Sequence, residues 1–136
     1  MEKRWLLILL IFLVECKPAR DISDENKAKL DACKDAGNEF EVKNCEYNTA
    51  LQAGYADYCY KLPEESDWKT KNDCLIEFAE SQKDESLCSY IKDADKSNEC
   101  FLKTSLSSRK VETCDKVDGE EKRNNCVNEF AIKNND

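Results

Sequence analysis

Beyond an apolar run near its start, the chain places hydrophobic residues at intervals that suit helices. A recurring motif has a cysteine, an apolar residue one place later and a small residue five places later. Two close copies are Cys74-Leu-Ile-Glu-Phe-Ala79 and Cys126-Val-Asn-Glu-Phe-Ala131. Positions 0, 1 and 5 lie along one stripe of an α-helix, whereas a strand would alternate polar and apolar residues. The pattern predicts an all-α fold.

Eight cysteines give this pattern its period. The gaps between them are 12, 14, 15, 14, 12, 14 and 12 residues, for Cys33, Cys45, Cys59, Cys74, Cys88, Cys100, Cys114 and Cys126. Taken in twos, they define four units with periods of 26, 29 and 26 residues, the last unit being truncated. A period of this size is typical of stacked arrays in which each unit buries one face on its neighbour.

Polar and glycine residues indicate where the helices begin and end. Acidic side chains suit a helix N-terminus, so we expect starts at Ser23-Asp24-Glu25 and at residues 64–67, after Pro63. Gly37 and Gly119 lie where a helix needs a left-handed exit. In the third unit we expect the turn between two helices at residues 93–97.

The spacing of the cysteines constrains their pairing. Twelve residues of continuous helix would separate two cysteines by about 18 Å, but a disulfide needs Cα atoms roughly 5.5–6 Å apart. The chain must double back, which predicts Cys33–Cys45, Cys59–Cys74, Cys88–Cys100 and Cys114–Cys126 within αα-hairpins. Pairing across the gaps of 14, with Cys33 joined to Cys126, is the alternative. We therefore predict a short array of four disulfide-stapled αα-hairpins, a small α-solenoid, over residues 30–136.

The composition explains why such a chain needs disulfides. Charged residues make up 37% of it, so few side chains are left to form a core. Ordering costs about 1.5 kcal/mol per residue, and each disulfide closing a short loop contributes on the order of 3 kcal/mol. We expect reduction to unfold the protein.

The N-terminal apolar run predicts export from the cytosol. It follows Lys3 and Arg4 and extends from Trp5 to Val14, about 15 Å as a helix, which is half the thickness of a bilayer core. We interpret residues 1–16 as a signal peptide, with a short uncleaved anchor as the alternative. Residues 17–29 are then a polar tether.

The end of this run resembles the lipobox of bacterial lipoproteins. Leu13-Val14-Glu15-Cys16 has the leucine and cysteine of that motif, with Glu15 in place of its small residue. The resemblance implies lipidation of Cys16, and it leaves an even number of cysteines for disulfides. An ordinary signal peptide cut nearby is the alternative.

Charge and missing residue types exclude several functions. A net charge of −8 repels phosphate backbones, so no nucleic-acid partner is expected. Without histidine there is no Ser-His-Asp system, and without a CxxC pair no zinc site is indicated. Asp93 opens a calcium-like loop that lacks its glycine and final glutamate, and Glu77 and Glu80 suit exposed helix faces. We expect no metal, no cofactor and no enzymatic activity.

Residues 84–91, Asp-Glu-Ser-Leu-Cys-Ser-Tyr-Ile, and 125–131, Asn-Cys-Val-Asn-Glu-Phe-Ala, resemble cysteine-bearing helical-hairpin repeats of secreted and membrane-anchored proteins in bacteria and archaea. The resemblance covers about residues 30–133, with Ala36 in place of the isoleucine and Tyr58 in place of the leucine. It implies a tetratricopeptide-like or Sel1-like solenoid that binds proteins and shares no catalytic residues.

The aromatic residues Tyr55, Tyr58, Tyr60 and Trp68 are the candidate interface, and packing within the second hairpin is their alternative role. We therefore expect an extracytoplasmic protein, on a cell-membrane or outer-membrane lipid anchor or otherwise secreted. Its partner would be a protein or a cell-envelope component. The alternative function is an inhibitor or immunity-type lipoprotein whose acidic surface blocks a basic toxin or lytic enzyme.

Overall fold

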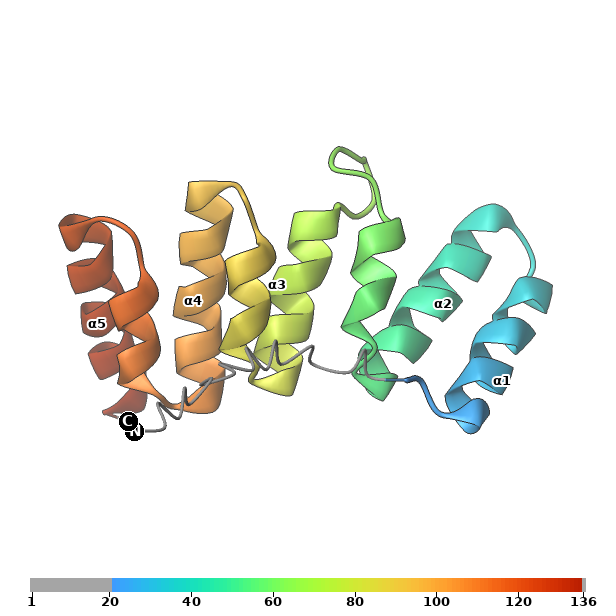
Figure 1. Ribbon diagram of the computed structural model, residues 1–136, viewed down its shortest axis with the longest axis horizontal. Coiled ribbons are helices and arrows are strands. Elements are labelled where there is room, and N and C mark those ends of the chain that lie inside the picture. The colour runs from blue at the N-terminus through green and yellow to red at the C-terminus, as the bar shows by residue number, and fades with distance from the viewer. Residues whose placement is uncertain (1–20, 136) are drawn as a thin grey trace, which may run out of the picture.

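The computed structural model describes residues 21–135, which form helices and no strand (Figure 1). The predicted all-α fold is confirmed. In chain order the elements are α1 (Asp24–Ala32), η1 (Cys33–Asp35), α2 (Glu39–Ala53), η2 (Ala56–Lys61), α3 (Lys71–Gln82), η3 (Glu85–Tyr90), α4 (Ala94–Ser108), η4 (Val111–Lys116) and α5 (Glu120–Asn134), where η denotes a 3₁₀-helix.

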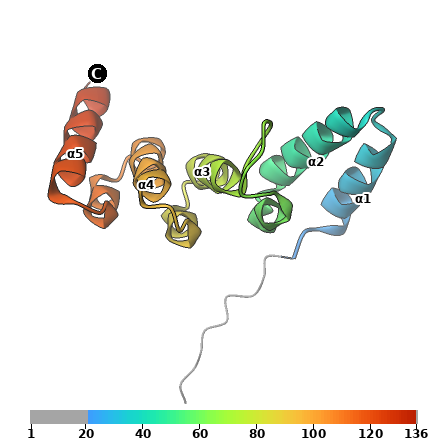
Figure 2. The same ribbon diagram turned by 90° about the horizontal axis from the view of Figure 1, so that it is seen from above.

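The helices stand side by side in a row from α1 to α5 (Figure 1). Seen from above, η2, η3 and η4 follow one side of the row, and the long helices α3, α4 and α5 follow the other (Figure 2). Each 3₁₀-helix is therefore the first arm of a hairpin, and the next α-helix is its second arm.

Four disulfides close these hairpins. They join Cys33–Cys45, Cys59–Cys74, Cys88–Cys100 and Cys114–Cys126, with Cα–Cα distances of 5.5 to 5.7 Å. These are the local pairs that the spacing predicts. The last three hairpins differ from the predicted αα form, because their first arm is a six-residue 3₁₀-helix. A 3₁₀-helix rises about 2.0 Å per residue against 1.5 Å, so a few residues reach from one end of a hairpin to the other.

Helix starts follow side-chain caps more closely than acidic runs. Ser23 accepts a hydrogen bond from the Asn26 N–H and caps α1, as predicted. Residues 24–29, expected in the tether, therefore belong to a helix. The start predicted at residues 64–67 is wrong, because α3 begins after Thr70, whose hydroxyl accepts from the Asp73 N–H at 3.1 Å. Thr70 satisfies a free backbone donor that the acidic run does not reach.

The predicted helix exits at glycines are also wrong. Gly119 precedes α5 with φ +91°, and Gly37 follows η1 with φ +118°. The left-handed exits lie at Gly54, Lys83 and Arg109. Two of these are not glycine, so the sequence carries no signal for them. After each exit a backbone N–H returns to a carbonyl inside the helix, at Ala50, Ala79 and Ser105.

The turn of the third unit is shorter than predicted. Asp93 accepts a hydrogen bond from the Lys96 N–H at 2.8 Å and so caps α4, which begins at Ala94. Most of the expected turn at residues 93–97 is helical. An aspartate in this position satisfies a backbone donor at the helix start, and the chain reverses over residues 91–93 instead.

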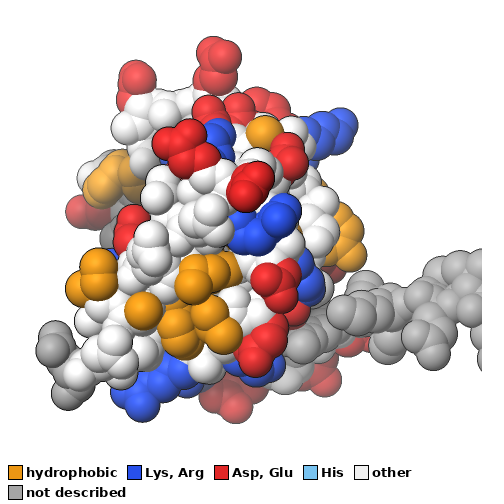
Figure 3. Space-filling view, turned by 90° about the vertical axis from the view of Figure 1, so that its left-hand side faces the viewer, with side chains coloured by type: hydrophobic (Ala, Val, Ile, Leu, Met, Phe, Trp, Pro, Cys, Tyr) orange, Lys and Arg blue, Asp and Glu red, His pale blue; other side chains and the backbone are white. Residues whose placement is uncertain are grey.

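The core consists of the disulfides and the motif positions. Leu75 and Phe101, each one place after a cysteine, are 0% and 6% exposed because the next hairpin covers them. Val127 has the same place on α5 but is 38% exposed. Figure 3 shows the α5 end of the molecule, where hydrophobic side chains gather among charged ones.

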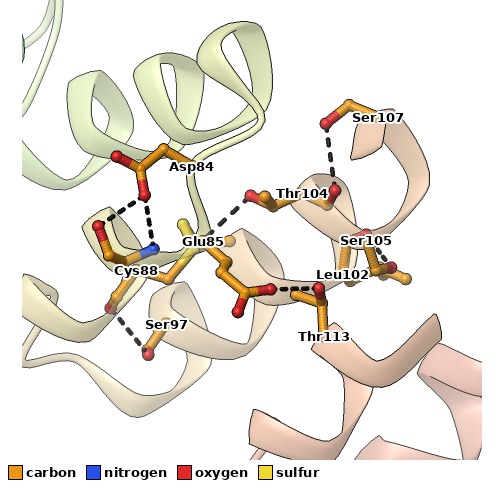
Figure 4. The surroundings of a disulfide bond; sticks show 11 residues. Asp84, Glu85, Cys88, Ser97, Leu102, Thr104, Ser105, Ser107 and Thr113 are labelled. Atoms are coloured by element: carbon orange, nitrogen blue, oxygen red, sulfur yellow. Dashed lines mark hydrogen bonds between the residues drawn. A yellow bond between two sulfur atoms is a disulfide. The ribbon is translucent and has the colours of Figure 1, made fainter. Parts of the chain in front are cut away.

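Polar residues inside the row have hydrogen-bond partners. Around the Cys88–Cys100 disulfide, the Ser97 hydroxyl donates to the Cys88 carbonyl at 3.2 Å, and Thr104 Oγ1 lies 3.6 Å from Cys88 Sγ (Figure 4). Buried Thr113 donates to Glu85 of the preceding hairpin. Such bonds offset the cost of burying hydroxyl groups.

Lysines connect successive hairpins. Lys96 of α4 pairs with Asp73 of α3 at 3.0 Å, and Lys122 of α5 pairs with Asp95 of α4 at 2.5 Å. Lys116 of η4 pairs with Glu85 of η3. In each case the lysine belongs to the later hairpin and the carboxylate to the earlier one, so the direction of the contact is constant.

Candidate binding pocket

A pocket of about 690 Å³ lies between the first half of α2 and the connection from η2 to α3. Pockets of this size are typical of ligand sites. The residues around it combine aromatic and aliphatic side chains with lysines and glutamates. They are Asn38, Glu39, Phe40, Lys43, Glu46, Tyr58, Lys61, Leu62, Pro63, Ser66, Trp68 and Lys69.

The connection over residues 62–70 is particular to the second hairpin. The cysteines of this hairpin are 15 residues apart, whereas those of the others are 12 apart. The longer connection rises above the row between η2 and α3 (Figure 1). The Lys71 N–H donates to the Pro63 carbonyl at 2.9 Å, and the Trp68 N–H donates to the Ser66 hydroxyl at 3.2 Å. These bonds hold the connection in place and put Trp68 at the pocket.

An aromatic cluster forms the floor and one wall of the pocket. Its centre is Tyr47, which is 4% exposed and meets Tyr58, Trp68 and Phe78 edge-to-face, at centroid distances of 6.3, 6.0 and 6.2 Å. Phe40 meets Trp68 at 6.3 Å and is 58% exposed. Edge-to-face pairs add stability beyond their buried area. The cluster fixes Trp68 while leaving Phe40 open to solvent.

A charged network lies beneath the aromatic rings. Glu77 accepts hydrogen bonds from the Tyr47 hydroxyl and from Lys69 Nζ, the latter at 2.5 Å. The Lys69 ammonium also lies 4.4 Å from the centre of the Tyr47 ring, within the range of a cation–π interaction. Because Lys69 belongs to the connection, Tyr47 to α2 and Glu77 to α3, the network joins the three segments that shape the pocket.

Burial and neighbouring carboxylates hold both pocket tyrosines in their neutral form. Burial, helped by the hydrogen bond to Glu77, raises the pKa of Tyr47 far above its ordinary value. Burial and the nearby Glu46 raise the pKa of Tyr58 to about 12. Both hydroxyls therefore remain hydrogen-bond donors at neutral pH.

The three lysines of the pocket differ in their partners. Lys43 pairs with Glu39 at 2.5 Å, and Lys69 pairs with Glu77. The Lys61 ammonium lies 5.8 Å from the centre of the Tyr58 ring. It forms no ion pair with any residue in the range 21–135. Lys61 is thus the pocket cation that remains free for a ligand.

The structure brings together only part of the predicted aromatic interface. Tyr58 and Trp68 line the pocket. Tyr55 packs half-buried against the core, and Tyr60 lies outside the pocket beside Tyr90, 6.5 Å between centroids. The sequence analysis missed Phe40 and Tyr47. Their spacing of seven residues places them on one face of α2, and this was the available signal.

The other sequence candidates do not form reactive sites. Glu77 is half-buried and hydrogen-bonded, rather than exposed as expected, and Glu80 is exposed. Asp93 caps α4, so most of the calcium-like loop is helical. Among the residues that the structure describes, no three His, Cys, Asp or Glu side chains are grouped to hold a metal.

The exported-protein hypothesis is supported in part. Four disulfides in a small domain are typical of an oxidising, extracytoplasmic compartment. No helix within residues 21–135 is long and apolar enough to cross a bilayer. The predicted signal peptide, residues 1–16, and the lipidation site Cys16 lie outside the described residues.

Comparisons of the chain with protein-family models, with curated proteins and with solved structures give no match.

Proposed function

We propose that this protein works outside the cytosol as a binding module, and that its pocket holds a segment of another protein. The observation that carries the proposal is the pocket that the extended second hairpin builds around Phe40 and Trp68. Exposed aromatic side chains beside a pocket are typical anchors of protein interfaces. The rigid network of Tyr47, Glu77 and Lys69 beneath them keeps the pocket formed before a partner arrives, which reduces the entropic cost of binding.

The fold and the location belong to the same proposal. Four hairpins of one kind, each tied by lysine to the one before it, act as a small α-solenoid that presents the pocket on its edge. Lipid attached to Cys16 would hold this array at a membrane surface. Replacing Cys16 by alanine should then release the protein from membranes and remove a lipid mass from the intact chain. An unchanged mass and unchanged membrane association would contradict the anchor alone.

Selection of peptides tests the binding function. A random peptide library displayed on phage is selected on the oxidised protein, and enriched peptides are measured by isothermal titration calorimetry. We expect Trp68→Ala to weaken their binding about tenfold or more, as for a central aromatic anchor. The matched control is Ile132→Ala, which removes a side chain 71% exposed on α5 and should leave affinity unchanged. Failure to enrich peptides, or equal binding to Trp68→Ala, would refute the function.

A further inference from the structure

We propose that the segment held in this pocket carries an apolar side chain next to a carboxylate, the apolar side chain between Phe40 and Trp68 and the carboxylate on Lys61. This inference rests on the proposed binding function and specifies the chemistry of the partner, an acidic peptide segment.

Charge in the pocket selects against a cationic ligand. Three lysines and two glutamates line it, which makes it locally positive in a chain of net charge −8. Aromatic rings attract cations, but Lys61 and Lys69 already lie over the rings of Tyr58 and Tyr47. A ligand cation would find these sites occupied and would be repelled by the ammonium groups.

Lys61 is the group that receives the carboxylate. The other two lysines have carboxylate partners, Glu39 and Glu77, at 2.5 Å each. The Lys61 side chain is exposed and unpaired within the described part of the chain. A charge-assisted hydrogen bond from its ammonium to a ligand oxygen therefore replaces water without breaking an existing ion pair.

Phe40 and Trp68 define the place of the apolar side chain. Their rings meet at an interplanar angle of 74°, so they form two walls of a corner. Leu62 and Pro63 add an aliphatic side from the connection. Phe40 is 58% exposed, and covering it with an apolar group removes that surface from water.

The floor of the pocket favours a peptide over an acyl chain. Directly beneath the aromatic rings lie the charges of Lys69 and Glu77. A long hydrocarbon chain would have to pass these charges at a cost in desolvation. A single side chain reaches only the corner above them, and the rest of a peptide remains in solvent.

The peptides enriched by selection also test this inference, with wild-type protein and three lysine variants. We expect aspartate or glutamate beside phenylalanine, tryptophan or leucine in the enriched sequences. Lys61→Gln should weaken their binding about fivefold, whereas Lys61→Arg keeps the charge and should preserve it. Lys92→Gln is the matched control, because Lys92 is also exposed and forms no ion pair with the described residues. Raising the ionic strength from about 0.01 to about 0.15 M should weaken wild-type binding more than Lys61→Gln binding.

The outcomes separate this inference from the function beneath it. Peptides that need Trp68 but carry no acidic residue, or that bind Lys61→Gln as tightly as wild type, would overturn the acidic ligand and leave the binding function standing. Peptides indifferent to Trp68, or no peptides at all, would overturn both. Tryptophan fluorescence with anionic phospholipid vesicles is the third arm, and saturable binding there that excludes the peptides would replace the peptide with a lipid.

Discussion

At the scale of single residues, Tyr47 has the most to do with the pocket. Its ring touches three other aromatic rings, and its hydroxyl donates to Glu77. Lys69 binds the same carboxylate from the opposite segment. Side chains from α2, α3 and the connection thus depend on one another, and removing one hydroxyl tests how strongly.

Replacing Tyr47 by phenylalanine should lower the free energy of unfolding by about 1–2 kcal/mol, because a hydrogen bond to a charged group is lost while Lys69 continues to satisfy Glu77. Urea unfolding followed by circular dichroism measures the change. Tyr90→Phe is the control, since Tyr90 is 55% exposed, and its effect should remain within about 0.5 kcal/mol. Equal effects of the two substitutions would contradict the role of the network.

The same tyrosines should make stability depend on alkaline pH. Their folded pKa values exceed the ordinary value near 10, to about 12 for Tyr58 and further for Tyr47. The folded state therefore keeps protons that the unfolded state releases, and stability is full below pH 10 and falls as pH rises toward 12. Urea midpoints across this range should fall less steeply for Tyr47→Phe than for wild type. Parallel slopes would show that Tyr47 contributes nothing to the pH dependence.

At the scale of elements, each hairpin relies on its neighbour and on its disulfide. Leu75 and Val127 have the same place after a cysteine, yet one is covered by the next hairpin and the other is not. The first hairpin differs in another way, because α1 buries no side chain of its own. Equivalent positions along the row should therefore respond differently to the same change.

Leu75→Ala should cost about 2–5 kcal/mol of stability, because it leaves a cavity in a fully buried site. Val127→Ala at the corresponding position on α5 should cost less than about 1 kcal/mol, since part of that side chain already faces water. Urea denaturation of the two variants beside wild type gives both values. A Val127→Ala cost as large as that of Leu75→Ala would mean that the α5 face is covered in solution.

The Cys33–Cys45 disulfide should be the first to open under limiting reductant. Cys45 is partly exposed, while the cysteines of the other three bridges are 0–2% exposed, and thiol attack requires access to a sulfur atom. Alkylation of free thiols followed by peptide mass spectrometry identifies the bridge that opens. Early labelling of Cys88 or Cys100 would contradict this order.

The sequence specified the periodic features and missed the irregular ones. Cysteine spacing predicted the disulfide pairs, because a helix of 12 residues is too long for a bridge. It did not predict 3₁₀ arms, which depend on how far a short segment must reach. The exits at Lys83 and Arg109 escaped notice because their conformation is imposed by tertiary packing and not by residue type. The pocket was found only in part, since Phe40 and Tyr47 meet Trp68 across a fold that spacing alone does not place.

At the scale of the whole molecule, disulfides connect parts of a chain with a modest core. The buried hydrophobic residues form one cluster, and eight of its seventeen buried hydrophobic side chains or neighbours are not needed to see that cysteines recur through it, from Cys59 to Cys126. Each bridge closes 12 to 15 residues, so each constrains the unfolded chain by on the order of 3 kcal/mol.

Full reduction should therefore unfold the protein near room temperature. Loss of the helical circular dichroism signal and of a cooperative melt after reduction, with return of both after reoxidation, is the expected result. A reduced and alkylated chain that keeps its helicity and its melting temperature would show that packing alone suffices.

The constant direction of the lysine contacts has a consequence for how molecules meet end to end. Lys96 and Lys122 each stand four places before the second cysteine of their hairpins, but the first hairpin has Glu41 there. A second molecule docking its first hairpin onto α5 would bring Glu41 toward Glu121, the counterpart of Asp95. Head-to-tail contacts that do not close produce fibres, and this repulsion opposes them. The open end of the row is thereby kept from polymerising.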